Sequence, residues 1–169
     1  GMSFLSGTAS AARIMFGDSG DNDIGMIKYA HDDNSMILVT NTNSAITISS
    51  AGEVNKPLNP CFAVYASVDQ VVDNTGGNTI VFGGETTDIG ANFASNVFTA
   101  PIAGKYRVSI KMLIEGLPDG AWVKVTMRPV NQQFVYIASG NDEYYFNVSF
   151  TEIFTMSASD TFDVQYVSS

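Results

Sequence analysis

Alternation of apolar and polar side chains with a period of two is the feature that most constrains the fold of this chain. It is clearest over residues 105–114, where Tyr106, Val108, Ile110, Met112 and Ile114 share one side and Lys105, Arg107, Ser109 and Lys111 share the other. Such alternation is typical of a strand with one buried face. No amphipathic helix of three turns is visible, and Ser, Thr, Asn and Gly, which weaken helices, take the place of many charged residues. The sequence therefore predicts an all-β protein.

Turn signals separate about eight such runs in the second part of the chain. A turn signal follows roughly every 8–14 residues, which is typical of a β-sandwich or jelly roll. The expected strands are residues 62–68, 79–82, 97–100, 105–114, 123–127, 134–138, 144–156 and 162–166. We therefore expect a jelly-roll head over residues 61–169.

Four shorter runs precede this part, at residues 13–16, 24–29, 35–40 and 45–49. Their apolar faces are thin, and a small sheet of this kind is marginal by itself. Ordering the backbone costs about 1–2 kcal/mol per residue, which one copy of this segment cannot offset. We therefore expect the segment to complete its core with identical copies, as cyclic symmetry allows.

The two parts meet at a stiff joint of sequence Lys-Pro-Leu-Asn-Pro, because each proline restricts its own backbone and that of its predecessor. The expected organisation has four segments. These are a flexible or short helical N-terminus (1–12), a β segment that assembles with its own copies (13–56), a Pro-rich joint (57–60) and the jelly-roll head (61–169).

Charge and cysteine content exclude several classes of protein. The formal net charge of −9, from 17 acids and 8 bases, argues against binding to nucleic acid or to an anionic membrane. Cys61 is the one cysteine, so no intrachain disulfide can form. No apolar run reaches the length of a membrane span, and no secretory signal is evident, so we expect no membrane insertion.

A GDSG sequence at residues 17–20 invites comparison with serine hydrolases. A serine nucleophile needs a histidine base beside it. The single histidine, His31, follows Ser19 by 12 residues, which fits neither the order of trypsin-like proteases nor that of GDS-type lipases. We expect a Gly/Asp-rich turn here and no catalysis.

Two weak metal sites are suggested by residue type. Asp18, Asp21 and Asp23 gather oxygen ligands that could suit Ca²⁺, although their spacing is not that of a helix-loop-helix calcium loop. His31 could meet its copies on a three-fold axis. A polar turn is the favoured interpretation of both, and no other cofactor is expected.

Aromatic residues of the second part provide weak candidates for ligand binding. Trp122, Tyr144 and Tyr145 could form a platform on which a sugar stacks. Packing inside the protein or between subunits is the favoured interpretation of these side chains.

The second part of the chain also resembles a known family. Its CFAVYASVDQ, NTIVFGGETTDIGANFASNVFTAPIAGKYRVSI and SASDTFDVQYV stretches resemble the globular head of complement component one, subcomponent q, and its tumour-necrosis-factor-like relatives. The densest match is a Pro-x-x-Gly-x-Tyr corner at residues 101–106 and the aromatic residues around it. The resemblance implies a jelly roll that forms a tight homotrimer, with trimmed loops because this head is short.

Residues 13–55 resemble the repetitive stalk segments of phage tail-fibre proteins. The resemblance is carried by an FGD turn, a G-x-I-x-Y strand, an H-x-x-N-x-M turn and strand, and an I-x-I-x-x-x-G-x-V ending. In that family three chains wrap together, so the resemblance implies that residues 13–56 form a trimeric β stalk.

The two resemblances imply a structural and adhesive virion protein. It would be a homotrimeric tail-fibre tip that presents a receptor- or glycan-binding surface to a host cell and contacts other virion fibre proteins. It would be made in the cytoplasm of the bacterial host and act outside the cell. Two alternatives remain: a trimerisation or capping module without a receptor role, and a secreted bacterial recognition module of the same head family.

Overall fold

The computed structural model describes residues 1–71, 77–129, 133–140 and 145–168. These residues form fifteen strands in antiparallel sheets and, throughout the described ranges, no helix. The all-β class predicted from the sequence is therefore confirmed. The chain divides into two compact units, Gly1–Asn59 and Pro60–Ser169, and this division falls within the Pro-rich segment.

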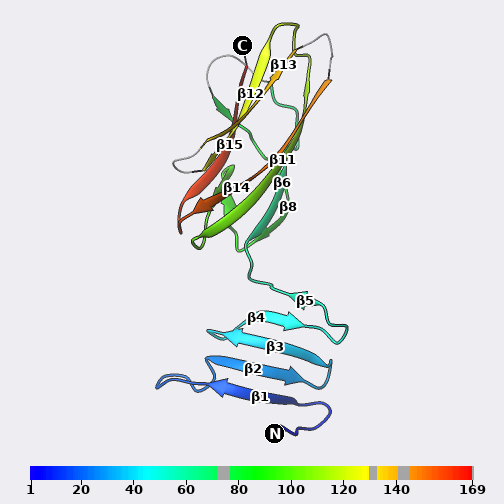
Figure 1. Cartoon of the computed structure of the whole chain (residues 1–169), viewed down its shortest axis with the longest axis vertical. Coiled ribbons are helices and arrows are strands. Elements are labelled where there is room, and N and C mark those ends of the chain that lie inside the picture. The colour runs from blue at the N-terminus through cyan, green and yellow to red at the C-terminus, as the bar shows by residue number, and fades with distance from the viewer. Residues whose placement is uncertain (72–76, 130–132, 141–144, 169) are drawn as a thin grey trace. The chain divides into compact units, whose positions relative to one another are not determined.

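The first unit is a meander of five strands that lie side by side in chain order (Figure 1). The strands are β1 (Ala11–Phe16), β2 (Gly25–Ala30), β3 (Ser35–Thr40), β4 (Asn43–Ile48) and β5 (Val54–Asn55). Asn41 and Thr42 form the two-residue turn between β3 and β4, and both have positive φ, at 48° and 63°. A turn of this handedness matches the twist of the strands that it joins. Residues 1–10 form no helix, and β1 begins at Ala11.

One sheet of the second unit contains six strands. Five of them follow the order β13-β12-β15-β10-β9, and β7 pairs separately with β15. The strands are β7 (Asn78–Thr79), β9 (Phe93–Ala94), β10 (Val97–Thr99), β12 (Trp122–Pro129), β13 (Phe134–Ser139) and β15 (Thr161–Ser168).

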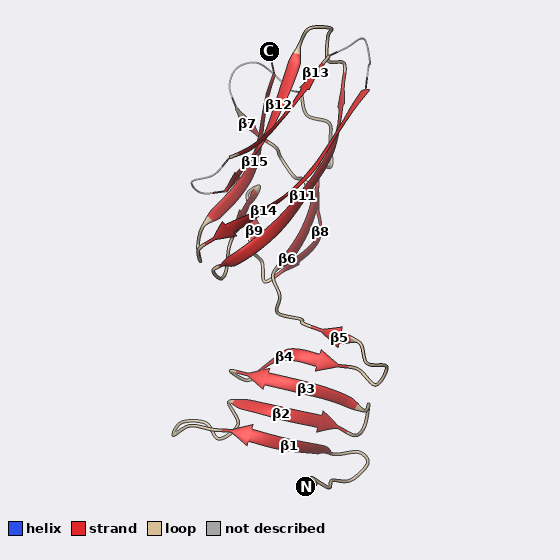
Figure 2. Cartoon of the chain, in the orientation of Figure 1, coloured by secondary structure: helices blue, strands red, loops and turns tan. Residues whose placement is uncertain are grey.

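The remaining strands of the second unit form two pairs, seen beside each other in Figure 2. β11 (Gly104–Glu115) pairs with β14 (Tyr145–Met156) over twelve residues, and β6 (Cys61–Tyr65) pairs with β8 (Gly84–Ile89). Within the described ranges, the edge of β11 that faces away from β14, its second edge, pairs with no other strand.

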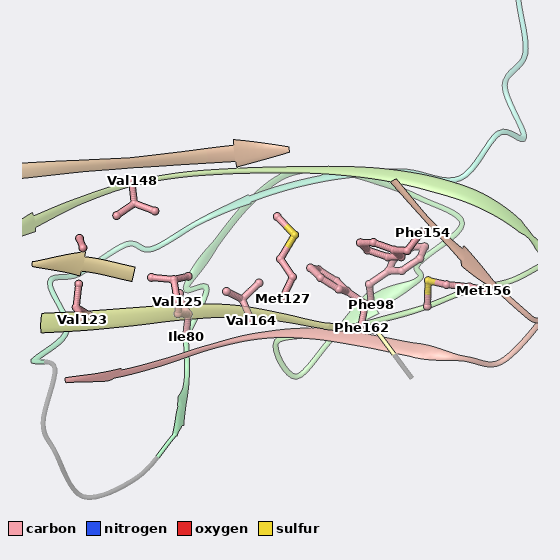
Figure 3. Packing of buried hydrophobic residues seen from close by; sticks show 12 residues of the cluster. Ile80, Phe98, Val123, Val125, Met127, Val148, Phe154, Met156, Phe162 and Val164 are labelled. Atoms are coloured by element: carbon pink, nitrogen blue, oxygen red, sulfur yellow. The ribbon is translucent and has the colours of Figure 1, made fainter. Parts of the chain in front are cut away.

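The core of the second unit lies between the six-stranded sheet and the β11–β14 pair. β12 contributes the most deeply buried side chains, and Val125 and Met127 are completely inaccessible. Figure 3 shows three phenylalanines, Phe98, Phe154 and Phe162, gathered beside Met156. The ring centroids of Phe154 and Phe162 are 5.3 Å apart. This cluster holds the two layers together.

A hydrogen bond anchors the corner that leads into β11. The hydroxyl of Tyr106 donates to the carbonyl of Ile102 at 2.7 Å. The Tyr106 ring also packs edge-on against Phe98, which itself stacks on Phe62 with the centroids 4.9 Å apart. The Pro-x-x-Gly-x-Tyr sequence thus places its tyrosine at the boundary between turn and core.

Candidate functional site

An uncharged apolar face covers one side of the five-stranded sheet. Two rows of side chains produce it, because the strand register places apolar residues directly opposite one another. The first row contains Ile14, Ile27, Leu38 and Ile46, and the second contains Ala12, Tyr29, Met36, Ile48 and Val54. Phe16 extends the same face at the end of β1. We call these ten residues the apolar face; none of them is charged.

No second layer of this chain's own first unit covers the apolar face. Ala30 is the one buried hydrophobic residue of residues 1–59, and its Cβ points to the opposite side of the sheet. Phe16 is 56% exposed, Met36 42% and Ile27 39%. A single sheet without a covering layer gains little from apolar burial, so this face is the candidate assembly surface of the chain.

The opposite side of the sheet is mixed in character: Met15, Met26 and Val39 form an apolar row, and a row with two bases lies beside it. Arg13 and Lys28 lie directly opposite each other on β1 and β2, and this row continues through Ile37 and Thr47. Like charges placed opposite one another on neighbouring strands are destabilising unless solvent separates them. The two bases therefore favour exposure of their row, whereas the apolar face carries no charge that would oppose its burial.

The apolar face is larger than the thin apolar surface of each single strand predicts. The alternation of Ile27 with Tyr29, Met36 with Leu38 and Ile46 with Ile48 was the available signal. The register that aligns these pairs into two rows becomes visible only with the structure.

The acidic residues suggested for Ca²⁺ form a self-contained turn between β1 and β2. One oxygen of the Asp18 carboxylate accepts hydrogen bonds from the backbone N–H groups of Gly20 at 2.7 Å and Asp21 at 2.9 Å. The Asp21 carboxylate accepts from the N–H of Asp23 at 3.1 Å. The described residues contain no group of three or more His, Cys, Asp or Glu side chains that could hold a metal ion.

The hydrogen bonds of this turn shift the pKa values of its three aspartates in opposite directions. The N–H groups of Gly20 and Asp21 lower the pKa of Asp18, and the N–H of Asp23 lowers that of Asp21. The pKa of Asp23 is raised, first by its hydrogen bond with the Asp21 side chain and then by the Asp21 charge. The Asp18 and Asp21 carboxylates thus accept hydrogen bonds from backbone groups of their own turn, and the Asp23 carboxyl interacts with the Asp21 side chain.

His31 lies in the turn between β2 and β3. Its backbone N–H donates to the carbonyl of Ser10 at 3.0 Å, and its ring meets the Tyr29 ring edge-on with the centroids 4.9 Å apart. Its Nε2 is buried and has no hydrogen-bond partner within the described chain. The structure does not bring His31 together with other metal-ligating side chains among the described residues.

Two of the three aromatic candidates for ligand binding lie in different sheets of the second unit. Trp122 begins β12 in the six-stranded sheet and is 37% exposed, whereas Tyr145 begins β14 in the other layer and is 55% exposed. Tyr144 lies outside the described residues. Trp122 and Tyr145 therefore belong to different surfaces of the unit.

Comparison with known proteins adds no identification. The sequence matches no protein-family model and no curated protein. In the described part of the chain there is also no helix that is long and apolar enough to cross a membrane.

Proposed function

We propose that this chain is a homotrimeric tail-fibre protein of phage or prophage origin. Residues 13–56 would form an intertwined trimeric β stalk, and residues 61–169 a jelly-roll head that also belongs to the trimer. The head would present a binding surface for a host-cell receptor or glycan. Its action would be mechanical and adhesive, outside the bacterial cell, without covalent chemistry, nucleic-acid binding or membrane insertion.

The apolar face is the observation that supports assembly. Fully burying a side chain such as Ile, Leu, Phe or Met is worth about 1.5–3 kcal/mol relative to leaving it in water. Ten residues on a single uncovered layer offer a large gain to any partner that covers them. Identical copies are suitable partners, because the face contains no charge that would repel its own image.

The trimer and the adhesive role rest further on the two sequence resemblances. Both the phage stalk segments and the complement-like heads assemble by threes. Three identical heads would bind a repetitive host surface with an avidity that exceeds the affinity of one head. Other fibre proteins of the virion would hold the assembly in place.

A solution mass measurement tests the assembly. Sedimentation equilibrium of the full chain at micromolar concentration should give a single species of three times 18.1 kDa. A monomer whose stalk amides are protected from hydrogen exchange would overturn the proposal. Adsorption of the labelled protein to candidate host cells tests the adhesive role separately.

A further inference from the structure

The outward side of the β11–β14 pair concentrates positive charge on an acidic protein. Lys105, Arg107 and Lys111 all point outward from β11 and are exposed, with Ser109 between them. These are three of the eight basic residues in a chain whose net charge is −9. We call this outward side, together with the exposed β14 residues Ser149, Thr151, Ile153 and Thr155 that lie beside the bases, the basic face.

No acid of the described chain neutralises these three bases. Among the described residues the one ion pair is that between Arg128 and Asp163. Glu152 of β14 is opposite Val108, so it belongs to the side that faces the core. Glu115 lies at the far end of β11. The bases are therefore available to an anionic group from outside.

Hydroxyl groups lie opposite two of the three bases, whereas the exposed Ile153 lies opposite Arg107. Thr155 lies opposite Lys105, and Ser149 lies opposite Lys111. Between them the side-chain hydroxyls of Ser109 and Thr151 share a hydrogen bond of 2.8 Å. Hydroxyls both donate and accept hydrogen bonds, whereas the bases only donate. The basic face can therefore recognise a ligand that carries hydroxyls as well as acidic groups.

The spacing of the bases distinguishes between classes of polyanion. Residues two apart on a strand are separated by about 7 Å, so Lys105 lies about 7 Å from Arg107, and Arg107 about 14 Å from Lys111. A nucleic-acid duplex carries a charge about every 3.4 Å along its axis on each strand, which is denser than these bases, and the net negative chain repels the denser polyanion more strongly. A polysaccharide whose carboxylates are separated by neutral hydroxyl-bearing positions fits better.

We propose that the basic face binds an acidic polysaccharide. This inference rests on the proposed adhesive function and names the chemical class of its receptor. The acidic groups of the sugar chain would pair with Lys105, Arg107 and Lys111, while the sugar hydroxyls would exchange hydrogen bonds with the serine and threonine hydroxyls on both strands.

Binding of hyaluronan to the full chain tests the inference, with dextran as the neutral polysaccharide and a double-stranded DNA oligonucleotide as the dense polyanion. Biolayer interferometry should show binding to hyaluronan that weakens as NaCl is added, and no binding to dextran. The K105Q/R107Q/K111Q variant should weaken hyaluronan binding by about tenfold or more, because each exposed charge pair contributes modestly. The matched control K124Q, which removes a base from the other sheet, should bind like the parent chain.

Other outcomes would overturn the inference. Equal binding to dextran would show that charge is irrelevant, and tighter binding to the oligonucleotide would indicate a nucleic-acid surface. If the triple variant retained hyaluronan binding but changed the mass of the assembly, the basic face would be an interface between copies. Circular-dichroism melting checks that the variant folds, and the mass measurement judges the trimer independently of polysaccharide binding.

Discussion

Arg128 and Asp163 lie directly opposite each other on β12 and β15 and form a two-pronged ion pair. Arg128 Nε donates to Asp163 Oδ1 at 2.9 Å, and Nη2 donates to Oδ2 at 2.6 Å. The hydrogen bonds to Asp163 raise the pKa of Arg128 above its already high ordinary value. The pair therefore stabilises the register between β12 and β15 in the larger sheet.

Replacing Arg128 should destabilise the second unit slightly. Its side chain is 40% exposed, so solvent screens the pair, and Arg128→Ala should lower the free energy of unfolding by about 1 kcal/mol or less. Arg128→Lys should recover only part of this loss, because an ammonium group cannot form both hydrogen bonds. Urea denaturation measures both, and an Arg128→Lys variant as stable as the parent chain would contradict the role of the paired hydrogen bonds.

Truncation of Met127 should have a much larger effect. Its side chain is completely buried between the layers of the second unit, so Met127→Ala should cost about 2–5 kcal/mol of unfolding free energy through lost contacts and a new cavity. Thermal denaturation followed by near-ultraviolet circular dichroism detects the loss. Met2→Ala is the matched control, because Met2 is 77% exposed and should be replaceable without effect.

A charge on the apolar face should dissociate the proposed trimer. Ile27→Asp places a carboxylate in the middle of the first row, and the loss of about 2 kcal/mol per copy should raise the dissociation concentration at least about a hundredfold. Sedimentation velocity over a dilution series measures this.

Lys28→Asp is the control for that experiment. Residue 28 is adjacent in sequence but lies on the opposite side of the sheet, where it is opposite Arg13. The new acid would pair with Arg13, and the assembly should persist. Equal dissociation of both variants would contradict the assignment of the apolar face as the contact.

The β1–β2 turn should loosen in acid. The pKa of Asp18 is lowered in the folded chain, so its carboxylate stabilises the turn fully above the ordinary aspartate pKa of about 4. This contribution is lost as the pH falls through the lower, folded-state value. The carbon-13 NMR shift of the Asp18 carboxyl should show a titration midpoint below the ordinary aspartate pKa. In Asp18→Asn, the Gly20 amide shift should lose that pH dependence.

The strands with clear alternation could be predicted from sequence because their pattern records which side is buried. The run at residues 105–114 lies within β11, and residues 35–40 coincide with β3. β8 was missed because its sequence, Gly-Glu-Thr-Thr-Asp-Ile, has no apolar alternation. Backbone pairing with β6 forms this strand. Gly84 lies against the ring of Tyr65, where a Cβ would collide with the ring.

The candidate sites were harder to predict because they depend on the pairing of distant segments. The sequence shows that Lys105, Arg107 and Lys111 share one side of a strand. It does not show that β14 supplies Ser149 and Thr151 beside them, since 42 residues separate Ser109 from Thr151. Register is set by the whole sheet, and no local pattern encodes it.

The second edge of β11 has a consequence for engineering. Its twelve residues form no ladder there within the described ranges, so a designed peptide of matching alternation could be docked as an additional strand. Repulsion among Lys105, Arg107 and Lys111 would discourage two identical edges from joining. The same protein could thus serve as a scaffold that captures a tagged peptide while resisting its own polymerisation.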